Sequence, residues 1–232
     1  MKKALHLILF FLTITTYSQL ATQPNNDFET WTALALDYKL NEKWSINLEE
    51  QLRLKNNATT INKYFTQIEG KYTKPKNFEY GIGIRYSRKN DNIGNIQNYE
   101  NHLRLHLQAA FKFKANRFGF KYRMRYQHKN ELGKSKAEGD YPSKYFRVKT
   151  TFAYNIKKWK LDPKVSIEVF RHNQIGALSG STKHRLSLET TYKLKKIGTI
   201  NLAYIREKQS KIWNPKKRRI VKLTYTHHLK KK

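Results

Sequence analysis

Apolar and polar residues alternate along most of this chain with a period of two, and the pattern is clearest between Tyr99 and Gln127. In its first half, Leu, Ala and Phe fill most of one set of positions, while Glu, His, Arg, Gln and Lys fill most of the other. After a short basic turn at Lys114–Arg117 the alternation resumes. Because successive side chains of a strand point to opposite faces, the stretch predicts a β-hairpin with one apolar, aromatic face and one charged face.

The same alternation recurs on both sides of the hairpin and predicts a chain made of strands. The spans are about 10–13 residues long, close to the length that a tilted strand needs to cross a bilayer. Short and long connections alternate, as do the turns and loops at the two ends of a membrane barrel. The predicted strands are Phe28–Leu40, Trp44–Lys55, Asn62–Tyr72, Phe78–Arg88, Tyr99–Phe113, Phe118–Gln127, Ser143–Ile156, Trp159–Arg171, Thr182–Leu194, one beginning at Ile200 and one containing Val221–Leu229.

The predicted fold class is all-β: a single closed antiparallel up-and-down transmembrane β-barrel of about 10–12 strands. The pattern gives eleven strands, whereas single-chain bacterial barrels have an even number, so we expect ten or twelve. An odd count would also leave the first strand starting on the side of the long loops. Glu50 falls on the apolar face of its strand, and we expect a bulge or a place near the membrane surface there. Gly81-x-Gly83 lies within a strand, which indicates a packing or bulge feature rather than a phosphate loop.

The first residues predict export. Lys2 and Lys3 precede an apolar run at Ala4–Thr15, and Thr16-Tyr17-Ser18 offers small residues at the positions that a cleavage site requires. We therefore predict a signal peptide at residues 1–18 and a mature barrel domain at residues 19–232. The predicted location is the outer membrane of a Gram-negative bacterium.

The composition is strongly basic, with 47 Lys and Arg against 17 Asp and Glu and a formal net charge of +30. Nucleic acid is the usual partner of such a chain, but export and the absence of a recognition helix argue against it. Anionic outer-membrane lipid and lipopolysaccharide are the expected partners, together with the barrel-assembly machinery. Cysteine is absent, which excludes thiolate catalysis and Cys-based metal sites. We predict no cofactor.

The charged faces of the strands mix both signs, and in a barrel they would line the lumen. One interpretation is a lumen filled by ion pairs, which we prefer because barrels of this size leave little free space. The alternative is a narrow pore or pocket for anions, with Arg as the ligand of carboxylate or phosphate. The predicted lumen-lining residues are Glu69, Arg85, His102, Arg104, His106, Arg123, Arg125, Arg147, Lys149, Glu168, Arg185 and Glu189.

His102 and His106 share a face but would lie about 13 Å apart along a strand, too far to hold one metal ion by themselves.

Two other functions remain open at this point. A lipid-modifying barrel enzyme would need a Ser–His–acid arrangement near the lipid boundary, and the sequence marks no particular Ser. A soluble exported barrel with a ligand inside would reverse the faces, placing the apolar side chains in the interior.

Several segments resemble a known family. The run Trp31…Leu36-Asp37-Tyr38-Lys39-Leu40-Asn41-Glu42-Lys43-Trp44-Ser45, followed by Leu48-Glu49-Glu50-Gln51-Leu52-Arg53, resembles the start of a Bacteroidota outer-membrane barrel family of unknown function. The Ser18-Gln19 junction is similar to exported proteins of that phylum. The resemblance implies one outer-membrane barrel of about 10–12 strands, with no established substrate or active site. The chain departs from the aromatic ending usual in outer-membrane barrels, since it ends Leu229-Lys230-Lys231-Lys232.

Overall fold

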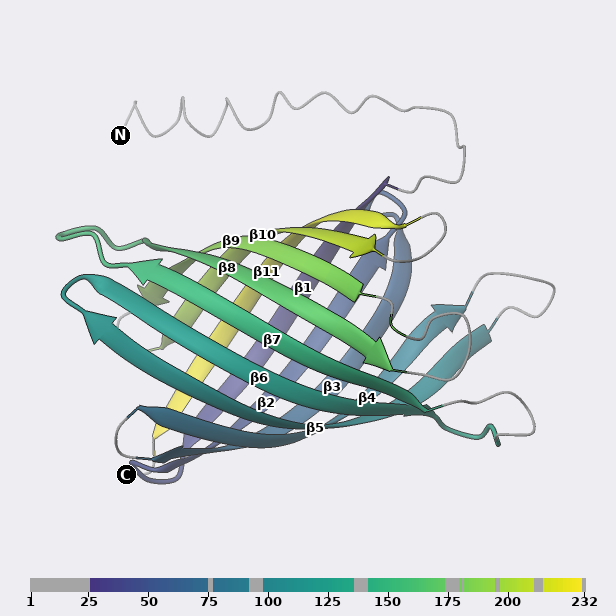
Figure 1. The fold of residues 1–232 in the computed structure, drawn as a ribbon, viewed down its shortest axis with the longest axis horizontal. Coiled ribbons are helices and arrows are strands. Elements are labelled where there is room, and N and C mark those ends of the chain that lie inside the picture. The colour runs from purple at the N-terminus through teal and green to yellow at the C-terminus, as the bar shows by residue number, and fades with distance from the viewer. Residues whose placement is uncertain are drawn as a thin grey trace.

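A computed structural model of the protein describes residues 26–74, 77–91, 98–135, 142–173, 180, 182–194, 197–210 and 215–230. The predicted signal peptide lies outside this range. In the described residues the chain forms eleven strands and no helix (Figure 1). They are β1 (Asn26–Lys39), β2 (Trp44–Lys55), β3 (Thr60–Lys74), β4 (Phe78–Asp91), β5 (Asn98–Ala115), β6 (Phe118–Glu131), β7 (Ser143–Tyr154), β8 (Asp162–Asn173), β9 (Thr182–Leu194), β10 (Gly198–Ser210) and β11 (Lys217–Lys230).

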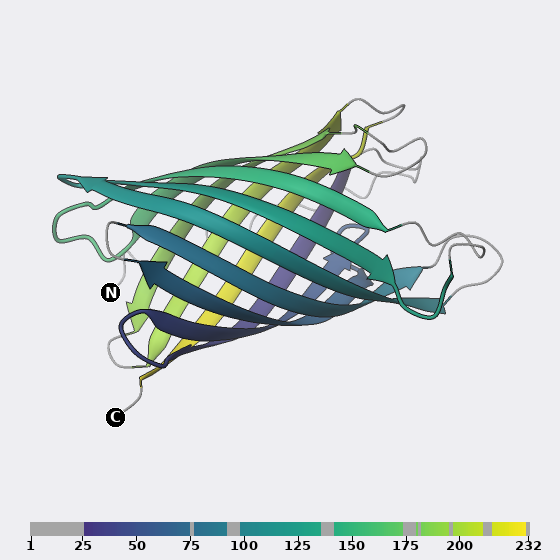
Figure 2. The ribbon, with the colours of Figure 1, turned by 60° about the horizontal axis from the view of Figure 1, so that its bottom comes forward.

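The strands form one closed barrel in which each pairs with its neighbours along the chain (Figure 2). All of these pairs are antiparallel, and the barrel closes where β1 pairs with β11 in parallel, from Asn26 beside Lys217 to Lys39 beside Lys230. The predicted closed all-β barrel is confirmed. The expectation of an even strand number is wrong, because a parallel seam lets an odd number of strands close without leaving an edge.

The chain connections lie at two rims, and the odd count puts the start of β1 and the end of β11 at opposite ones. β1 begins at the rim that carries the connections 56–59, 92–97, 132–142, 174–181 and 211–216, which we call the long-loop rim. β11 ends at the opposite rim, the short-turn rim, which carries 40–43, 75–77, 116–117, 155–161 and 195–197. The first strand therefore starts on the side of the long loops, which is the consequence of an odd strand count that had favoured the expectation of ten or twelve strands.

Most apolar side chains point outward from the barrel and most polar side chains point inward. Leu107 and Leu188 are 57% and 56% exposed, whereas their neighbours His106 and Ser187 are 2% and 3% exposed. This is the opposite of the soluble barrel considered above, in which the apolar face would be inside. No helix in the described part of the chain is long and apolar enough to span a membrane.

Strand ends differ from the sequence prediction in several places. β3 begins at Thr60, and β6 continues to Glu131, so the strands reach further toward the long-loop rim than the apolar pattern does. The predicted strand Trp159–Arg171 is wrong at its start: β8 begins at Asp162, and Trp159 lies in the turn, 59% exposed. The alternation of apolar residues extends through Trp159 and Leu161, although both precede the strand.

Gly81 and Gly83 of β4 make room for side chains that cross the interior. A Cβ at Gly83 would lie 2.3 Å from Cε1 of His106, and one at Gly81 would lie 2.7 Å from Nε2 of Gln108. The pairing of β4 with β5 is regular through both positions. The two glycines are therefore a packing feature and not a bulge.

Glu50 lies on the outer face of β2 in the middle of the strand, opposite Leu34 of β1 and Thr66 of β3. Its side chain is exposed. The register shift between β2 and β3 lies at Arg53 and Leu54, so the expected bulge at Glu50 is wrong. The structure gives no partner that explains this carboxylate on an apolar surface.

The β2–β3 turn is held by the start of β1. Asn56, Asn57 and Ala58 all have positive φ, at 55°, 57° and 63°. The carboxylate of Asp27 accepts hydrogen bonds from the backbone N–H groups of Asn56 and Asn57 at 3.1 and 3.0 Å. Asn tolerates this conformation and Ala does not, so the anchoring to β1 stabilises an otherwise strained turn.

Candidate functional site: the barrel lumen

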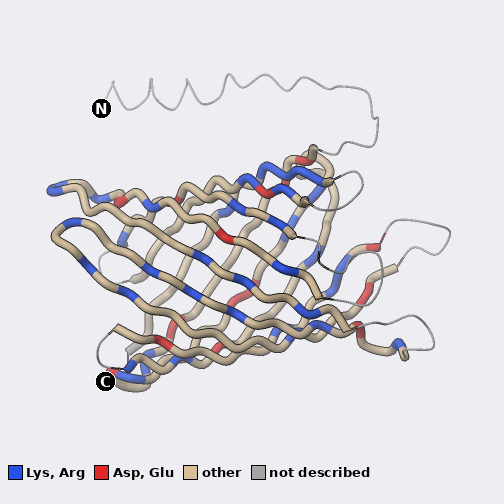
Figure 3. Tube along the Cα trace, viewed as in Figure 1, with Lys and Arg blue, Asp and Glu red and all other residues tan. Residues whose placement is uncertain are grey.

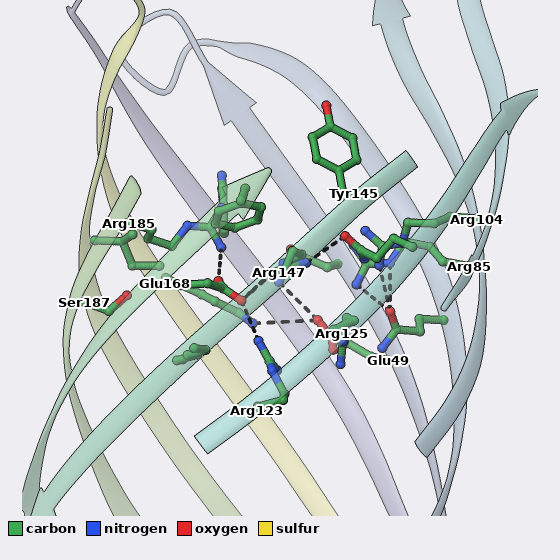
Figure 4. A pocket seen from close by; sticks show the side chains of 18 of the residues that line it. Glu49, Arg85, Arg104, Arg123, Arg125, Tyr145, Arg147, Glu168, Arg185 and Ser187 are labelled. Carbon is green, nitrogen blue, oxygen red and sulfur yellow. Dashed lines mark hydrogen bonds and ion pairs between the residues drawn. The ribbon is translucent and has the colours of Figure 1, made fainter. Parts of the chain in front are cut away.

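The lumen contains a cavity of about 480 Å³ whose wall is strongly basic (Figure 4). Thirteen of its lining residues are Lys or Arg and four are Glu, an excess of nine positive charges. The cations come from strands all round the barrel, as the inward parity of each strand dictates. The charge of the wall is therefore a property of the whole fold and not of one loop.

Glu168 of β8 is the centre of the ion pairs on one side of the cavity, and it is 3% exposed. Its Oε1 accepts hydrogen bonds from Arg123 at 2.7 Å and from Arg147 at 2.8 and 3.2 Å. Nη1 of Arg185 lies 3.5 Å from its Oε2. One carboxylate thus faces three guanidinium groups from β6, β7 and β9 (Figure 4), and it ties these strands together electrostatically.

A second group of ion pairs crosses the parallel seam. Glu207 of β10 pairs with Arg185 at 2.5 Å and with Arg218 of β11 at 3.0 Å. Nε of Arg218 also lies 3.1 Å from Glu29 of β1. Glu29 in turn accepts a hydrogen bond from Nε1 of Trp31 at 2.8 Å. Side chains therefore reinforce the pair of strands that closes the barrel.

A third group surrounds Glu69 of β3. The carboxylate contacts Nε2 of His106 at 2.9 Å, accepts a hydrogen bond from Gln108 at 2.8 Å, and lies 3.2 Å from Nη2 of Arg125. Arg125 also donates to Oε1 of Gln108. All four side chains are buried. His106 thus serves a hydrogen-bonded network that spans β3, β5 and β6.

The wall formed by β2, β4 and β5 carries three arginines that form no ion pair among the described residues, and Glu49 of β2 lines the same cavity. Oε1 of Gln67 accepts hydrogen bonds from Arg85 at 3.0 and 2.7 Å and from Arg104 at 3.1 Å. No ion pair of the described residues involves these two arginines or Arg53, and Nε of Arg104 is buried without a hydrogen-bond partner. We call Arg53, Arg85 and Arg104 the unpaired arginine cluster.

Aromatic rings hold two members of this cluster in place. The guanidinium carbon of Arg85 lies 3.4 Å from the ring centroid of Phe65, and that of Arg53 lies 3.7 Å from the ring of Trp31. Stacking on an aromatic face orients a guanidinium plane without neutralising its charge. The cluster is therefore preorganised and positively charged, which is the arrangement that receives a carboxylate or a phosphate.

The structure places every sequence-predicted lumen residue on the inner side of the barrel. His102 and His106 are buried there without lining the cavity, and His102 lies 3.0 Å from Glu100. The two histidines contact different carboxylates, and no group of three or more His, Cys, Asp or Glu within the described ranges is placed to hold a metal ion. The residues that line the cavity itself are Glu69, Arg85, Arg104, Arg123, Arg125, Arg147, Lys149, Glu168, Arg185 and Glu189.

Sequence reasoning missed the aromatic side chains inside the lumen. Trp31, Phe65 and Phe170 are 4%, 1% and 4% exposed, and each supports one or more arginines. Their position in the alternation could have identified them, since Phe65 falls on the same face as the polar residues Gln67 and Glu69. The prediction instead assigned aromatic residues to the outer face.

One serine and one histidine also meet near the long-loop rim. Oγ of Ser143, the first residue of β7, lies 2.7 Å from Nε2 of His172 near the end of β8. The ring of Tyr145 stacks on His172 with centroids 4.3 Å apart. Both members of the pair are buried. Sequence spacing could not identify this contact, because the register across the β7–β8 turn brings the two together.

An apolar outer face around a charged interior defines the class of this protein: it is a transmembrane-type β-barrel. Residues 28–216 match DUF2490, described as a protein of unknown function, and the chain belongs to that family. A search of curated proteins found no significant match.

Two solved structures share the architecture. The beta domain of the Bordetella autotransporter BrkA is 10% identical with a TM-score of 0.50, over 78% of this chain and 82% of that one. The anion-selective porin from Comamonas acidovorans is also 10% identical, with a TM-score of 0.36, over 75% of this chain and 47% of the porin. At these identities the likeness concerns the fold alone, and the porin's score supports no argument about function.

Proposed function

We propose that this protein acts in an outer membrane as a narrow barrel whose lumen accepts small anions in preference to cations. The observation that carries the proposal is the excess of nine positive charges in the cavity wall. A low-dielectric wall around a pore focuses the field of such charges on the ions inside. Ion pairs pack the lumen around Glu168, while the three members of the unpaired arginine cluster form no ion pair within the described residues.

The unpaired arginine cluster is the proposed place of contact with the anion. Gln67 holds Arg85 and Arg104 side by side, and neither arginine forms an ion pair with a carboxylate of the described residues. A passing or bound anion exchanges part of its hydration shell for these guanidinium groups. The other predicted lumen residues set the field and the width of the passage rather than binding the anion directly.

Ion selectivity in planar lipid bilayers tests the proposal. Under a potassium chloride gradient, the reversal potential should have the sign of anion preference, and Arg85→Gln with Arg104→Gln should move it toward zero. The matched control is Arg206→Gln with Arg219→Gln, which removes the same charge from the outer surface and should leave the reversal potential unchanged. Cation preference, or equal shifts in both variants, would refute the proposal. A protein that inserts without conducting would remove the channel and leave a structural barrel.

The outer-membrane location belongs to the same proposal. It is supported by the apolar outer face and by the likeness to an autotransporter beta domain. It makes outer-membrane lipid, lipopolysaccharide and the barrel-assembly machinery the expected partners. Recovery in the outer-membrane fraction with heat-modifiable gel mobility supports it, and a freely soluble monomer contradicts it. The signal peptide and the Bacteroidota origin stay predictions, and a mature protein beginning at Gln19 would support the first.

A lipid-modifying enzyme is the second candidate, favoured by the 2.7 Å contact between Ser143 and His172. A serine in contact with an imidazole has the arrangement of a nucleophile and its general base. Incubation of the purified protein with phospholipid and lipopolysaccharide, followed by product analysis, decides the question. Product formation that Ser143→Ala abolishes would support hydrolysis, and no product from the folded wild-type protein would exclude this candidate.

A further inference from the structure

The outer surface of β10 and β11 carries a group of cations at the long-loop rim. Arg206 and Lys208 of β10 lie directly opposite Arg219 and Lys217 of β11. All four side chains are exposed. They share the outward parity of Tyr204, which is 42% exposed, whereas Glu207 between Arg206 and Lys208 is 3% exposed. We call these four residues the outer basic patch; Lys and Arg are dense in this part of the chain trace (Figure 3).

The patch has no acidic partner in the described part of the barrel. The nearest carboxylate in sequence, Glu207, points inward and pairs with Lys183, Arg185 and Arg218. Like charges directly opposite each other destabilise a pair of strands. Two such pairs in succession are therefore an uncompensated cost in the protein alone, and an external anion would remove it.

A neighbouring strand extends the positive surface. Arg171 of β8 is exposed, and the exposed His184 of β9 lies opposite Lys208. On the other flank of the barrel the corresponding outward cation is Arg88, whose guanidinium carbon lies 5.1 Å from the ring of Tyr99. Among the described residues, the exposed outward lysine and arginine side chains at this rim gather on β7 to β11, where Lys144 of β7 is another.

Apolar side chains lie beside the patch and beneath it, toward the other rim. Leu186 of β9 lies opposite Arg206, and Tyr204 and Leu223 follow toward the other rim; they are 48%, 42% and 46% exposed on the same outer face. Alternate residues of a tilted strand differ in height by about 5 Å. The cation Arg206 and the apolar ring of Tyr204 are thus consecutive outward residues of the same strand. This arrangement matches a lipid with a charged headgroup above its acyl chains.

We propose that the outer basic patch binds the phosphate groups of a lipopolysaccharide-type glycolipid, whose acyl chains lie on the apolar surface below. Arginine suits this ligand because its planar fork binds phosphate oxygens in pairs. Long loops of membrane barrels face the outside of the cell, so this rim lies in the leaflet that holds such a lipid. The inference rests on the proposed membrane location but is independent of the anion preference of the lumen.

The test is a titration of the folded full-length protein, in zwitterionic micelles, with bisphosphorylated lipid A and with its dephosphorylated form. Bound lipid is counted by native mass spectrometry. The bisphosphorylated form should bind more tightly and saturably. Arg206→Gln with Arg219→Gln should weaken it by roughly fivefold per cation, hence about 25-fold for the pair. Arg85→Gln with Arg104→Gln removes equal charge inside the barrel and should leave this binding unchanged.

Lys208→Gln with Lys217→Gln provides an independent test if the arginine variant does not fold, as judged by heat-modifiable mobility. Equal affinity for the two lipid forms, or unchanged affinity in a folded patch variant, would overturn the inference. Competition by millimolar inorganic phosphate alone would assign the patch to free phosphate and would also overturn it. Flotation with liposomes separates the two proposals: failure to float refutes the membrane location, whereas flotation without phosphate discrimination refutes only the lipid site.

Discussion

Replacing Glu168 with Gln should be among the most damaging conservative changes in the lumen. The carboxylate lies within 3.5 Å of Arg123, Arg147 and Arg185 and is 3% exposed. A pair of unit charges about 4 Å apart, at an effective dielectric constant of about 20, is worth about 4 kcal/mol. Gln keeps the shape and an acceptor oxygen but loses the charge, so the three guanidinium groups then repel one another.

The net cost is smaller than the sum of three pairs, because the variant no longer removes a carboxylate from water. Removal of one partner from a buried ion pair costs about 3–5 kcal/mol in practice, and we expect Glu168→Gln to fall in this range. Glu189→Gln is the matched control, since Glu189 forms one ion pair within the described residues, with Lys149 at 3.3 Å, and its side chain is 20% exposed. An exposed or partly exposed pair contributes about 0–1 kcal/mol.

Urea titration of the barrel in micelles, followed by the heat-modifiable gel band, measures both free energies of unfolding. Adding Arg147→Gln to Glu168→Gln should recover part of the loss, because one of the repelling charges is removed. The electrostatic reasoning is refuted if the two single variants are equally stable, or if the second substitution deepens the loss.

Three further predictions concern other parts of the barrel and use the same unfolding assay. Glu50→Leu should raise the free energy of unfolding by up to about 2 kcal/mol, because a charge on the lipid-facing side of a strand is unfavourable; a less stable variant would show that Glu50 has a partner in the membrane. Gly83→Ala should cost about 1–3 kcal/mol, because the added Cβ meets the His106 ring at 2.3 Å, and a neutral result would contradict this packing. Gly119→Ala should be tolerated within about 0.5 kcal/mol, since its nearest neighbour lies 3.7 Å away, and a large loss would contradict it.

Much of the barrel could be predicted from the sequence because each strand has one face toward apolar surroundings and the other toward a polar lumen. The period-two pattern around Leu105 and Leu107 separates outer from inner residues wherever both faces are long enough to read. The pattern could not predict how the barrel closes. Local alternation is identical in parallel and antiparallel pairs, so only the count of strands hinted at the seam between β1 and β11.

The lumen was predictable in its residues but not in its pairing. Inward parity identified Glu168 and Arg185, yet the division into a side packed with ion pairs and a side with unpaired arginines depends on register between strands distant in sequence. Phe65 was missed because an aromatic residue was assigned to the lipid side, although here its ring supports Arg85. A ring that stacks on a guanidinium group lies on the same face of the strand as the charged residues, although the ring itself is hydrophobic.

The parallel pairing of β1 and β11 also determines at which rim each end of the barrel sequence lies. In a barrel with an even number of strands both chain ends return to the same compartment, but here Asn26 and Lys230 lie at opposite rims. In the membrane location proposed above, reporters placed at Asn26 and at Lys230 would therefore sit in different compartments, one accessible to reagents added to intact cells and the other protected. These two positions would report which way the barrel is inserted.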